Sequence, residues 1–355
     1  MSRFFSDKYA ALTPYVPGEQ PRDMQYLKLN TNESPYPPLP EVVEAAREEA
    51  ARAHLYSDPT AFALRQALAA RYNVSPDEVI AVNGSDEALN FAFMAFCDAA
   101  HPAVFPDVTY GFYPVFARLC GVPYEEIPLR EDFTLDPEEY IRWPGKTVFL
   151  ANPNAPTGIF LPLAQVERIV RADPDRVVIV DEAYVDFGGE SAIKLIPQYP
   201  NLLVVRTYSK SRSLAGARLG FAVGQSSLIA DLETIRYSTN PYNVNRMTLA
   251  MGAASLAHDE INRQRCRTVA EVRDRTAAEM RSLGFDVTDS SANFLFARHP
   301  AVDGESFYRK LRQRGILVRH FTLPRIRDYN RITVGTAEQM KTFTAAVREI
   351  LEEST

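Results

Sequence analysis

Short apolar runs, each ending in polar residues and followed by a helix-like stretch, recur through the first two thirds of the chain. The clearest runs are VIAV at 79–82, VVIVD at 177–181 and LLVVRT at 202–207. Strands that are apolar on both faces and alternate with helices are typical of a parallel sheet covered on two sides. The sequence therefore predicts an α/β fold whose large domain has a mostly parallel central sheet covered by helices.

The pattern changes after about residue 245, where a long helical stretch precedes short strands and a closing helix. At 355 residues the chain exceeds the size at which one hydrophobic core usually stops growing. We expect a large domain at 41–245 and a smaller α+β domain at 246–355. Residues 1–40 are irregular and proline-rich. They predict an extended arm that belongs to the small domain or a dimer contact, or alternatively a proline-rich ligand for another protein.

Charge argues against general affinity for nucleic acid, because the formal net charge is −6. Arginines cluster at 262–284, but acids interleave with them. That stretch is interpreted as a solvated helix face, with a binding patch as the alternative.

Cysteine and histidine spacing predicts no metal site. The three cysteines lie far apart without a CxxC pair, and the five histidines form no HExxH. Neither a signal peptide nor an apolar run long enough to span a bilayer is evident. We therefore expect a cytoplasmic protein without membrane partners.

Polar residues stand where the predicted strands stop. In open α/β sheets the ligand crevice lies at the carboxyl ends of the strands. We expect one meeting place for Ser85, Tyr110, Asn154, Asp181 and Lys210.

Lys210 follows the run LLVVRT in a chain that uses arginine for most of its positive charge. A lysine at the rim of a buried site has a lowered pKa, and its neutral amine can attack a carbonyl to form a Schiff base. The alternative is a surface lysine in a salt bridge.

Asp181 ends another apolar run, so an unpaired carboxylate there would protonate unless a cation held it ionised. The pyridinium nitrogen of pyridoxal 5′-phosphate (PLP) is such a cation, and PLP sites combine this acid with a Schiff-base lysine. The alternative is an ion pair with a nearby arginine.

Phosphate-binding groups accompany these two residues. NGSDEAL at 83–89 offers backbone N–H groups at a predicted helix start, with Ser85 or Asp86 able to cap the helix. Ser209 adds a hydroxyl, and Arg218 can bind two phosphate oxygens. Tyr110 could stack on an aromatic ring or simply pack in the protein.

Motifs spread over nearly the whole chain resemble the fold-type I PLP-dependent aminotransferases of class I and II, and more narrowly the histidinol-phosphate aminotransferase family. The matching segments are LTPYVPG, LKLNTNESPYPP, YSDP, NGSDEAL, DVTYGFY, NPNAPTG, VDEAYVDF, RTYSKSRSLAGARLG and NRITVGT. DEAY followed about thirty residues later by SK and LAGAR is a specific combination.

The resemblance implies catalytic roles for three residues. Lys210 forms the Schiff base, Asp181 pairs with the ring nitrogen, and Tyr184 bonds the ring oxygen. Tyr110 stacks on the ring, and Tyr56 reaches the phosphate in the neighbouring subunit, which implies a homodimer. The remaining cofactor residues implied by the resemblance are Ser85, Asp86, Asn154, Thr207, Ser209 and Arg218.

One position departs from the family pattern. The family has asparagine directly before PTG, contacting the ring oxygen, whereas this chain has Ala155 there. Either Asn154 serves from a shifted loop, or Tyr184 bears that role alone.

The resemblance implies transamination between histidinol phosphate and 2-oxoglutarate, in histidine biosynthesis. It places the anion on Arg331, with Arg319 as a second arginine or else a surface strand residue. The pocket would include Tyr15, Asn32 and Tyr242.

Rival functions remain on the same scaffold: an aromatic amino-acid aminotransferase or a threonine-phosphate decarboxylase. A nucleotide-binding dehydrogenase would suit the α/β pattern, but the chain has no GxGxxG after a strand. A regulator built on the PLP fold would need a DNA-binding domain, which the first 40 residues are too short to supply.

Overall fold

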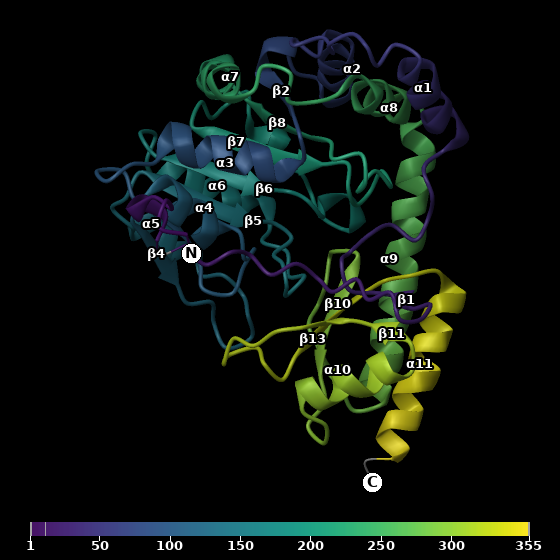
Figure 1. Cartoon of the computed structure of the whole chain (residues 1–355). Helices are drawn as coiled ribbons and strands as arrows, with labels where there is room; N and C mark the ends of the chain where they lie inside the picture. The colour runs from purple at the N-terminus through teal and green to yellow at the C-terminus, as the bar shows by residue number, and fades with distance from the viewer. Residues whose placement is uncertain (1, 11, 354–355) are drawn as a thin grey trace.

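A large lobe and a smaller lobe make up the computed structural model, which describes residues 2–10 and 12–353 (Figure 1). Over these residues, seven strands form the central sheet in the order β2-β8-β7-β6-β5-β3-β4. β8 runs antiparallel to both its neighbours, and the other pairs are parallel. The predicted mostly parallel sheet is confirmed. Its strands are β2 (Val79–Val82), β3 (Ala103–Pro106), β4 (Tyr124–Ile127), β5 (Thr147–Ala151), β6 (Val177–Asp181), β7 (Leu202–Thr207) and β8 (Gly220–Gly224).

Helices cover both faces of this sheet because alternate strand residues point to opposite sides. Val178 and Val180 join one apolar cluster, while Ile179 between them joins another. The first face is covered by α1 (Pro40–Ala50), α2 (Phe62–Tyr72), α5 (Pro137–Arg142) and α6 (Leu163–Ala172). The second is covered by α3 (Ser85–Phe96), α4 (Tyr113–Cys120) and α7 (Ser226–Thr239).

The second face shows how aromatic residues fill the space between sheet and helices. Phe149 of β5 stacks on Phe93 of α3, with ring centroids 4.1 Å apart. Both side chains are fully buried, which stabilises the fold by about 1.5–3 kcal/mol for each ring.

The smaller lobe is α+β. A four-stranded antiparallel sheet has the order β12-β13-β10-β9. Its strands are β9 (Asp286–Val287), β10 (Phe294–Arg298), β12 (Arg319–His320) and β13 (Asn330–Thr333). α8 (Arg246–Ala257) packs on α1 and α2, and α9 (Asp259–Ser282) then runs along the molecule into the smaller lobe (Figure 1). The lobe is completed by α10 (Gly304–Gln313) and α11 (Ala337–Glu352).

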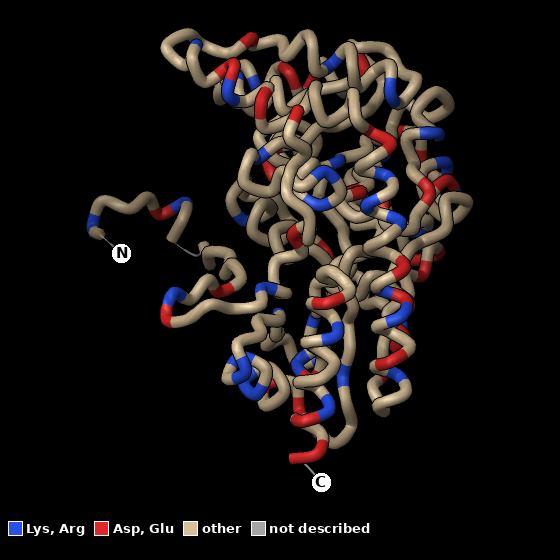
Figure 2. The backbone as a smooth tube through the Cα atoms, turned by 90° about the vertical axis from the view of Figure 1, so that its right-hand side faces the viewer, with Lys and Arg blue, Asp and Glu red and all other residues tan. Residues whose placement is uncertain are grey.

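The N-terminal arm runs between the two lobes (Figure 1). β1 (Leu27–Lys28) pairs in parallel with β11 (Ile316–Leu317). The first residues stand off from the body of the molecule, and Lys and Arg are interspersed with Asp and Glu along the chain (Figure 2). The arm, whose sequence has no periodic pattern, is therefore tied to the smaller lobe by this strand pairing.

The start of α3 corrects one sequence prediction. Gly84 is the N-cap residue, with φ of 82°, and neither Ser85 nor Asp86 makes a side-chain cap. A β-carbon at position 84 would lie 2.6 Å from Nη2 of Arg218. Glycine is therefore needed here, for its positive φ and for the close approach of that guanidinium.

Within residues 2–10 and 12–353, no helix has the length and apolarity to cross a bilayer. The same residues contain no group of His, Cys, Asp or Glu side chains able to hold a metal ion.

Candidate active site

A cavity of about 390 Å³ lies at the carboxyl ends of β6 and β7 and the start of α3. Residues that are distant in sequence line it, as expected for strand-end residues of one sheet. The predicted site residues in its wall are Ser85, Asp86, Tyr110, Asp181, Tyr184, Thr207, Ser209, Lys210 and Arg218.

Lys210 extends into this cavity just beyond β7. Its Nζ donates a hydrogen bond to the backbone carbonyl of Thr31 at 3.0 Å. Burial, with the positive charge of Arg331, lowers the pKa of Lys210 to about 8. No described residue forms a salt bridge with this amine. The surface salt-bridge alternative therefore does not describe Lys210, whose amine is partly neutral near pH 8.

Asp181 is the last residue of β6 and is 5% exposed. Its carboxylate accepts from the Ala183 backbone N–H at 3.1 Å and from the Tyr113 hydroxyl at 3.4 Å. Among the described residues, no cation lies within ion-pair distance of Asp181, and burial raises its pKa to about 7. Arg206, on the adjacent strand β7, pairs instead with Glu182, the residue that follows Asp181, at 3.6 Å. The carboxylate of Asp181 thus lacks the counter-charge that a buried acid needs.

Phosphate-sized anions would meet several donors at one end of the cavity. The Arg218 guanidinium lies 3.4 Å from an Asp86 carboxylate oxygen at the N-terminus of α3. Thr207 donates its hydroxyl hydrogen to Ser209 at 2.9 Å. Helix-start N–H groups, hydroxyls and a guanidinium are a donor set typical of phosphate binding.

Two tyrosines border the cavity. The Tyr110 hydroxyl donates to Asp86 at 2.7 Å, which fixes its ring beside the helix start. Burial raises the pKa of Tyr184, so its hydroxyl keeps its proton. The Tyr184 ring packs edge-on against Phe294 at 5.0 Å.

Arg331, on β13 of the smaller lobe, is a half-buried cation without an acidic partner among the described residues. Its Nη2 donates to the Asn30 carbonyl at 3.2 Å, while Nε has no hydrogen-bond partner. Burial lowers the pKa of Arg331, and its charge influences both Lys210 and Tyr184. A half-buried guanidinium without an acidic partner favours an anionic ligand.

Asn154 does not line the cavity, although it is buried. Its amide donates to the Val108 carbonyl at 2.9 Å and to the Thr157 hydroxyl at 3.0 Å, and its side-chain oxygen accepts from Thr109 at 2.8 Å. The cavity wall at this point is formed by Ala155. These bonds direct Asn154 away from the place that the shifted-loop alternative requires.

Seven predicted residues lie outside the cavity wall: Asn154 and Arg331, described above, then Asn32, and finally Tyr15, Tyr56, Tyr242 and Arg319. Tyr56 and Tyr242 stack on each other at 4.4 Å and are 78% and 42% exposed. Tyr15 stacks on Phe112 at 4.3 Å. Arg319 donates to the carbonyls of Pro17 and Val16, at 3.0 and 2.8 Å, and so holds the arm.

The sequence prediction missed the three polar lining residues Gln20, Thr31 and Glu33, all from the arm. Glu33 accepts from Lys28 at 2.7 Å and from Thr31 at 2.8 Å. The mostly polar run LNTNES at 29–34 could have indicated site residues, because it directly follows strand β1, as polar residues follow the other strands that end at the site.

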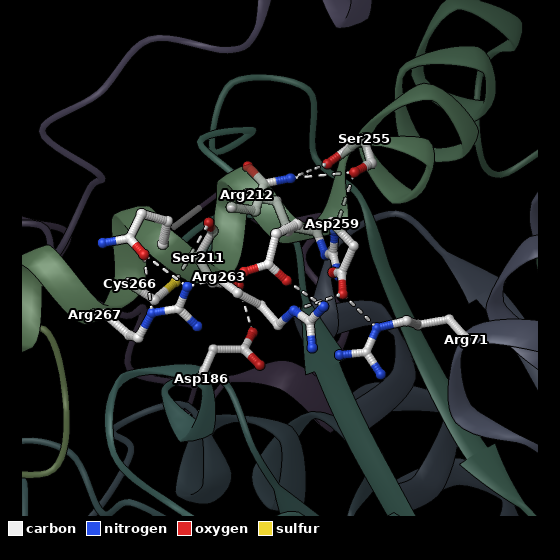
Figure 3. Close-up of polar contacts among 12 residues, drawn as sticks. Arg71, Asp186, Ser211, Arg212, Ser255, Asp259, Arg263, Cys266 and Arg267 are labelled. Carbon is white, nitrogen blue, oxygen red and sulfur yellow. Dashed lines mark hydrogen bonds and ion pairs between the residues drawn. The ribbon is translucent and has the colours of Figure 1, made fainter.

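A polar cluster holds the segment that follows Lys210 (Figure 3). Ser211 donates to Asp186 at 2.5 Å, and Arg212 contacts Asp259 of α9 at 2.5 Å. Arg71 also binds Asp259, at 2.6 Å. The loop carrying the lysine is thus fixed to the helix that leads into the smaller lobe.

The fold and this cavity define a class of protein. A family model described as aminotransferase class I and II matches residues 24–347. The chain is a PLP-dependent aminotransferase by family.

Relatives narrow the class. The chain is 50% identical to histidinol-phosphate aminotransferase 2 of Dechloromonas aromatica, over 99% of both chains. It is also 50% identical to the histidinol-phosphate aminotransferase of Aromatoleum aromaticum, over 99% of this chain and 100% of the relative. The chain therefore belongs to the histidinol-phosphate aminotransferase family, as the motifs predicted.

Solved structures share the fold. The histidinol-phosphate aminotransferase from Sinorhizobium meliloti in complex with PLP superposes with a TM-score of 0.89 at 24% identity, covering 100% of this chain and 99% of that one. A putative histidinol-phosphate aminotransferase from Erwinia carotovora gives 0.86 at 25% identity, covering 93% and 97%. The fold-type I prediction is confirmed.

Proposed function

We propose that this chain binds PLP in the 390 Å³ cavity and transfers the amino group of histidinol phosphate to 2-oxoglutarate. The observation that carries the proposal is the pairing, in one cavity, of an amine and a carboxylate that both lack protein counter-charges. Lys210 and Asp181 are those groups. Relatives at 50% identity, named for histidinol phosphate, support the amino donor.

The donor set fits PLP at three separate points. Asp181 offers a carboxylate to the ring nitrogen, and Lys210 offers an amine to the aldehyde. The phosphate end has backbone N–H groups and side chains of the set Ser85, Asp86, Thr207, Ser209 and Arg218. When bound, PLP supplies an electron sink for the charge that develops on the substrate carbon.

Each polar side chain then has a task in transamination. The Lys210 amine would act first as a base, which removes the proton from the substrate carbon, and then as an acid, which delivers it to a carbon of the bound cofactor. Positioned proton transfer of this kind typically raises the rate by about 10²–10⁴-fold. Asp181 keeps a proton on the ring nitrogen, and Tyr184 donates to the ring oxygen. Tyr110 covers one face of the ring.

Arg331 provides the anion site for both substrates. Its unpaired Nε leaves donor capacity for a phosphate or a carboxylate. Arg319 supports that site indirectly, because it holds Val16 and Pro17 of the arm next to Tyr15.

A homodimer completes the site in this proposal. Tyr56 and Tyr242 form an exposed aromatic pair, and the Arg246 guanidinium holds the Tyr56 carbonyl at 2.7 Å. That exposure suits side chains that reach the partner subunit's cofactor. Mixing inactive Lys210→Ala with inactive Tyr56→Ala should restore about a quarter of the activity, because one site per mixed dimer is intact.

We place the enzyme in the cytoplasm.

A substrate panel tests the proposal. Purified protein supplied with PLP should turn over histidinol phosphate with 2-oxoglutarate faster than phenylalanine or phosphothreonine. Faster turnover of phenylalanine would assign an aromatic aminotransferase instead. Release of carbon dioxide from phosphothreonine would assign a decarboxylase, and failure to bind PLP would reject all three.

A further inference from the structure

Asn32 contributes a hydrogen bond that reaches the cavity through another residue. Its Nδ2 donates to the Tyr184 hydroxyl oxygen at 3.0 Å, although the two residues lie 152 positions apart. The Asn32 side chain is buried, and its backbone has φ of 55°, in the left-handed region that asparagine tolerates.

The orientation of the Asn32 amide is fixed by Thr333. The Asn32 backbone N–H donates to the Thr333 hydroxyl oxygen at 2.9 Å, and that hydroxyl donates to Asn32 Oδ1 at 3.0 Å. Because Oδ1 is engaged by a donor, the amide nitrogen must face Tyr184. Asn293 also anchors this segment, by donating to the Asn32 carbonyl at 3.0 Å.

The consequence concerns the proton of Tyr184. Since its oxygen accepts from Asn32, its own O–H is directed elsewhere, and the described residues offer it no other hydrogen bond. Tyr184 lines the cavity, and contact with Phe294 restricts its ring. The Tyr184 O–H is therefore free to donate a hydrogen bond to a ligand in the cavity.

The neighbouring wall offers no substitute donor. Ala155 has no polar side-chain atom, and the Asn154 amide is bound to Val108 and Thr157. We propose that Asn32 is a positioning residue, which makes Tyr184 a fixed and polarised donor to the ring oxygen of the cofactor. This inference rests on the proposed PLP site.

Absorbance of the bound cofactor as a function of pH tests this inference apart from activity. A donor to the ring oxygen stabilises its anionic form, so loss of that donor should raise the pKa read from the spectrum. Holoenzyme would be titrated as wild type, Asn32→Gly, Tyr184→Phe and the double variant. Glycine keeps the positive φ that position 32 requires.

We expect Asn32→Gly and Tyr184→Phe each to raise this pKa, by up to about one unit. The double variant should match Tyr184→Phe alone, because Asn32 acts through that hydroxyl. Asn293→Ala is the matched control: it removes a buried amide that bonds the same backbone, and it should lower the melting temperature without moving the pKa.

Two results would overturn the inference. An unshifted pKa in Asn32→Gly, with a lowered melting temperature like that of Asn293→Ala, would make Asn32 merely structural. An equal shift from Asn32→Gly in the Tyr184→Phe background would mean that Asn32 acts on the cofactor directly. Should Asn32→Gly not fold, Thr333→Val frees the amide to turn and should raise the pKa, whereas no shift would also overturn the inference. A wild-type protein without cofactor absorbance would instead reject the proposed function.

Discussion

Arg212, two residues after Lys210, lies 2.5 Å from the carboxylate of Asp259, the first residue of α9. Asp259 also pairs with Arg71 at 2.6 Å and Arg263 at 3.2 Å, so one carboxylate forms ion pairs with three arginines (Figure 3). This cluster joins the lysine loop to the helix that carries the smaller lobe.

Replacing Asp259 by asparagine should therefore destabilise the protein by about 3–5 kcal/mol, because Arg212 would be left as a buried, unpaired charge. Urea unfolding measures this change. Glu260→Gln, at the next and more exposed position, should cost less than about 1 kcal/mol. Equal losses in the two variants would contradict this account of the cluster.

Lys210→Ala should keep the fold and bind PLP without a covalent link, while transamination falls by at least about 10²-fold. Borohydride reduction followed by mass spectrometry should find the cofactor on residue 210 of the wild type and on no residue of the variant. Lys194→Ala, at an exposed lysine paired with Glu190, should behave like the wild type. Normal turnover by Lys210→Ala would show the mechanism to be wrong.

Uptake of PLP by cofactor-free protein should depend on pH through Lys210. Only the neutral amine attacks the aldehyde, and burial lowers the pKa of Lys210 to about 8. The rate constant should rise with pH, with a midpoint near 8. Stopped-flow absorbance would measure it, and a midpoint near 10 would contradict the buried position of the amine.

Asp181→Asn should stabilise the cofactor-free protein at pH 8 but hardly at pH 4. Burial raises the pKa of Asp181 to about 7, so the folded state binds more protons than the unfolded state between about pH 4 and pH 7. Wild-type stability should fall as pH rises through that window, by on the order of 4 kcal/mol. Glu182 remains in both proteins, so the difference between their urea unfolding curves isolates residue 181.

Arg331→Ala should lower kcat/KM for histidinol phosphate by at least about 30-fold, the consequence of losing about 2 kcal/mol or more of charge-assisted binding. Arg331→Lys keeps the charge but loses the two-pronged geometry, so its kcat/KM should lie between those of the wild type and Arg331→Ala. Arg298→Ala on the adjacent strand removes an exposed arginine paired with Asp286 and should change little. Steady-state kinetics would fail to support the anion site if all three variants matched the wild type.

Residues at strand ends could be predicted from the sequence. Asp181 ends one β-branched run and Lys210 follows another. The carboxyl ends of adjacent parallel strands lie at the same edge of the sheet, so the two residues come together independently of the loop conformations. The sheet itself followed from the same runs, because buried parallel strands need apolar residues on both faces.

Residues placed by tertiary contacts could not be predicted in this way. Thr31 and Glu33 reach the cavity because β1 pairs with β11, across nearly 300 positions of sequence, and no local pattern encodes that pairing. Asn154 follows a strand, like the other candidates, yet its hydrogen bonds to Val108 and Thr157 turn its amide away from the cavity. At the start of α3, the approach of Arg218 favours glycine over a capping side chain.

The hydrogen bond from Lys210 to the Thr31 carbonyl has a consequence for biosynthesis. Thr31 is held in place by the β1–β11 pairing, so a nascent chain still awaiting Ile316–Leu317 from the ribosome lacks this wall, even when its central sheet has formed. Arg331 emerges later still. The complete wall around Lys210 can therefore form only after nearly nine tenths of the chain has been synthesised.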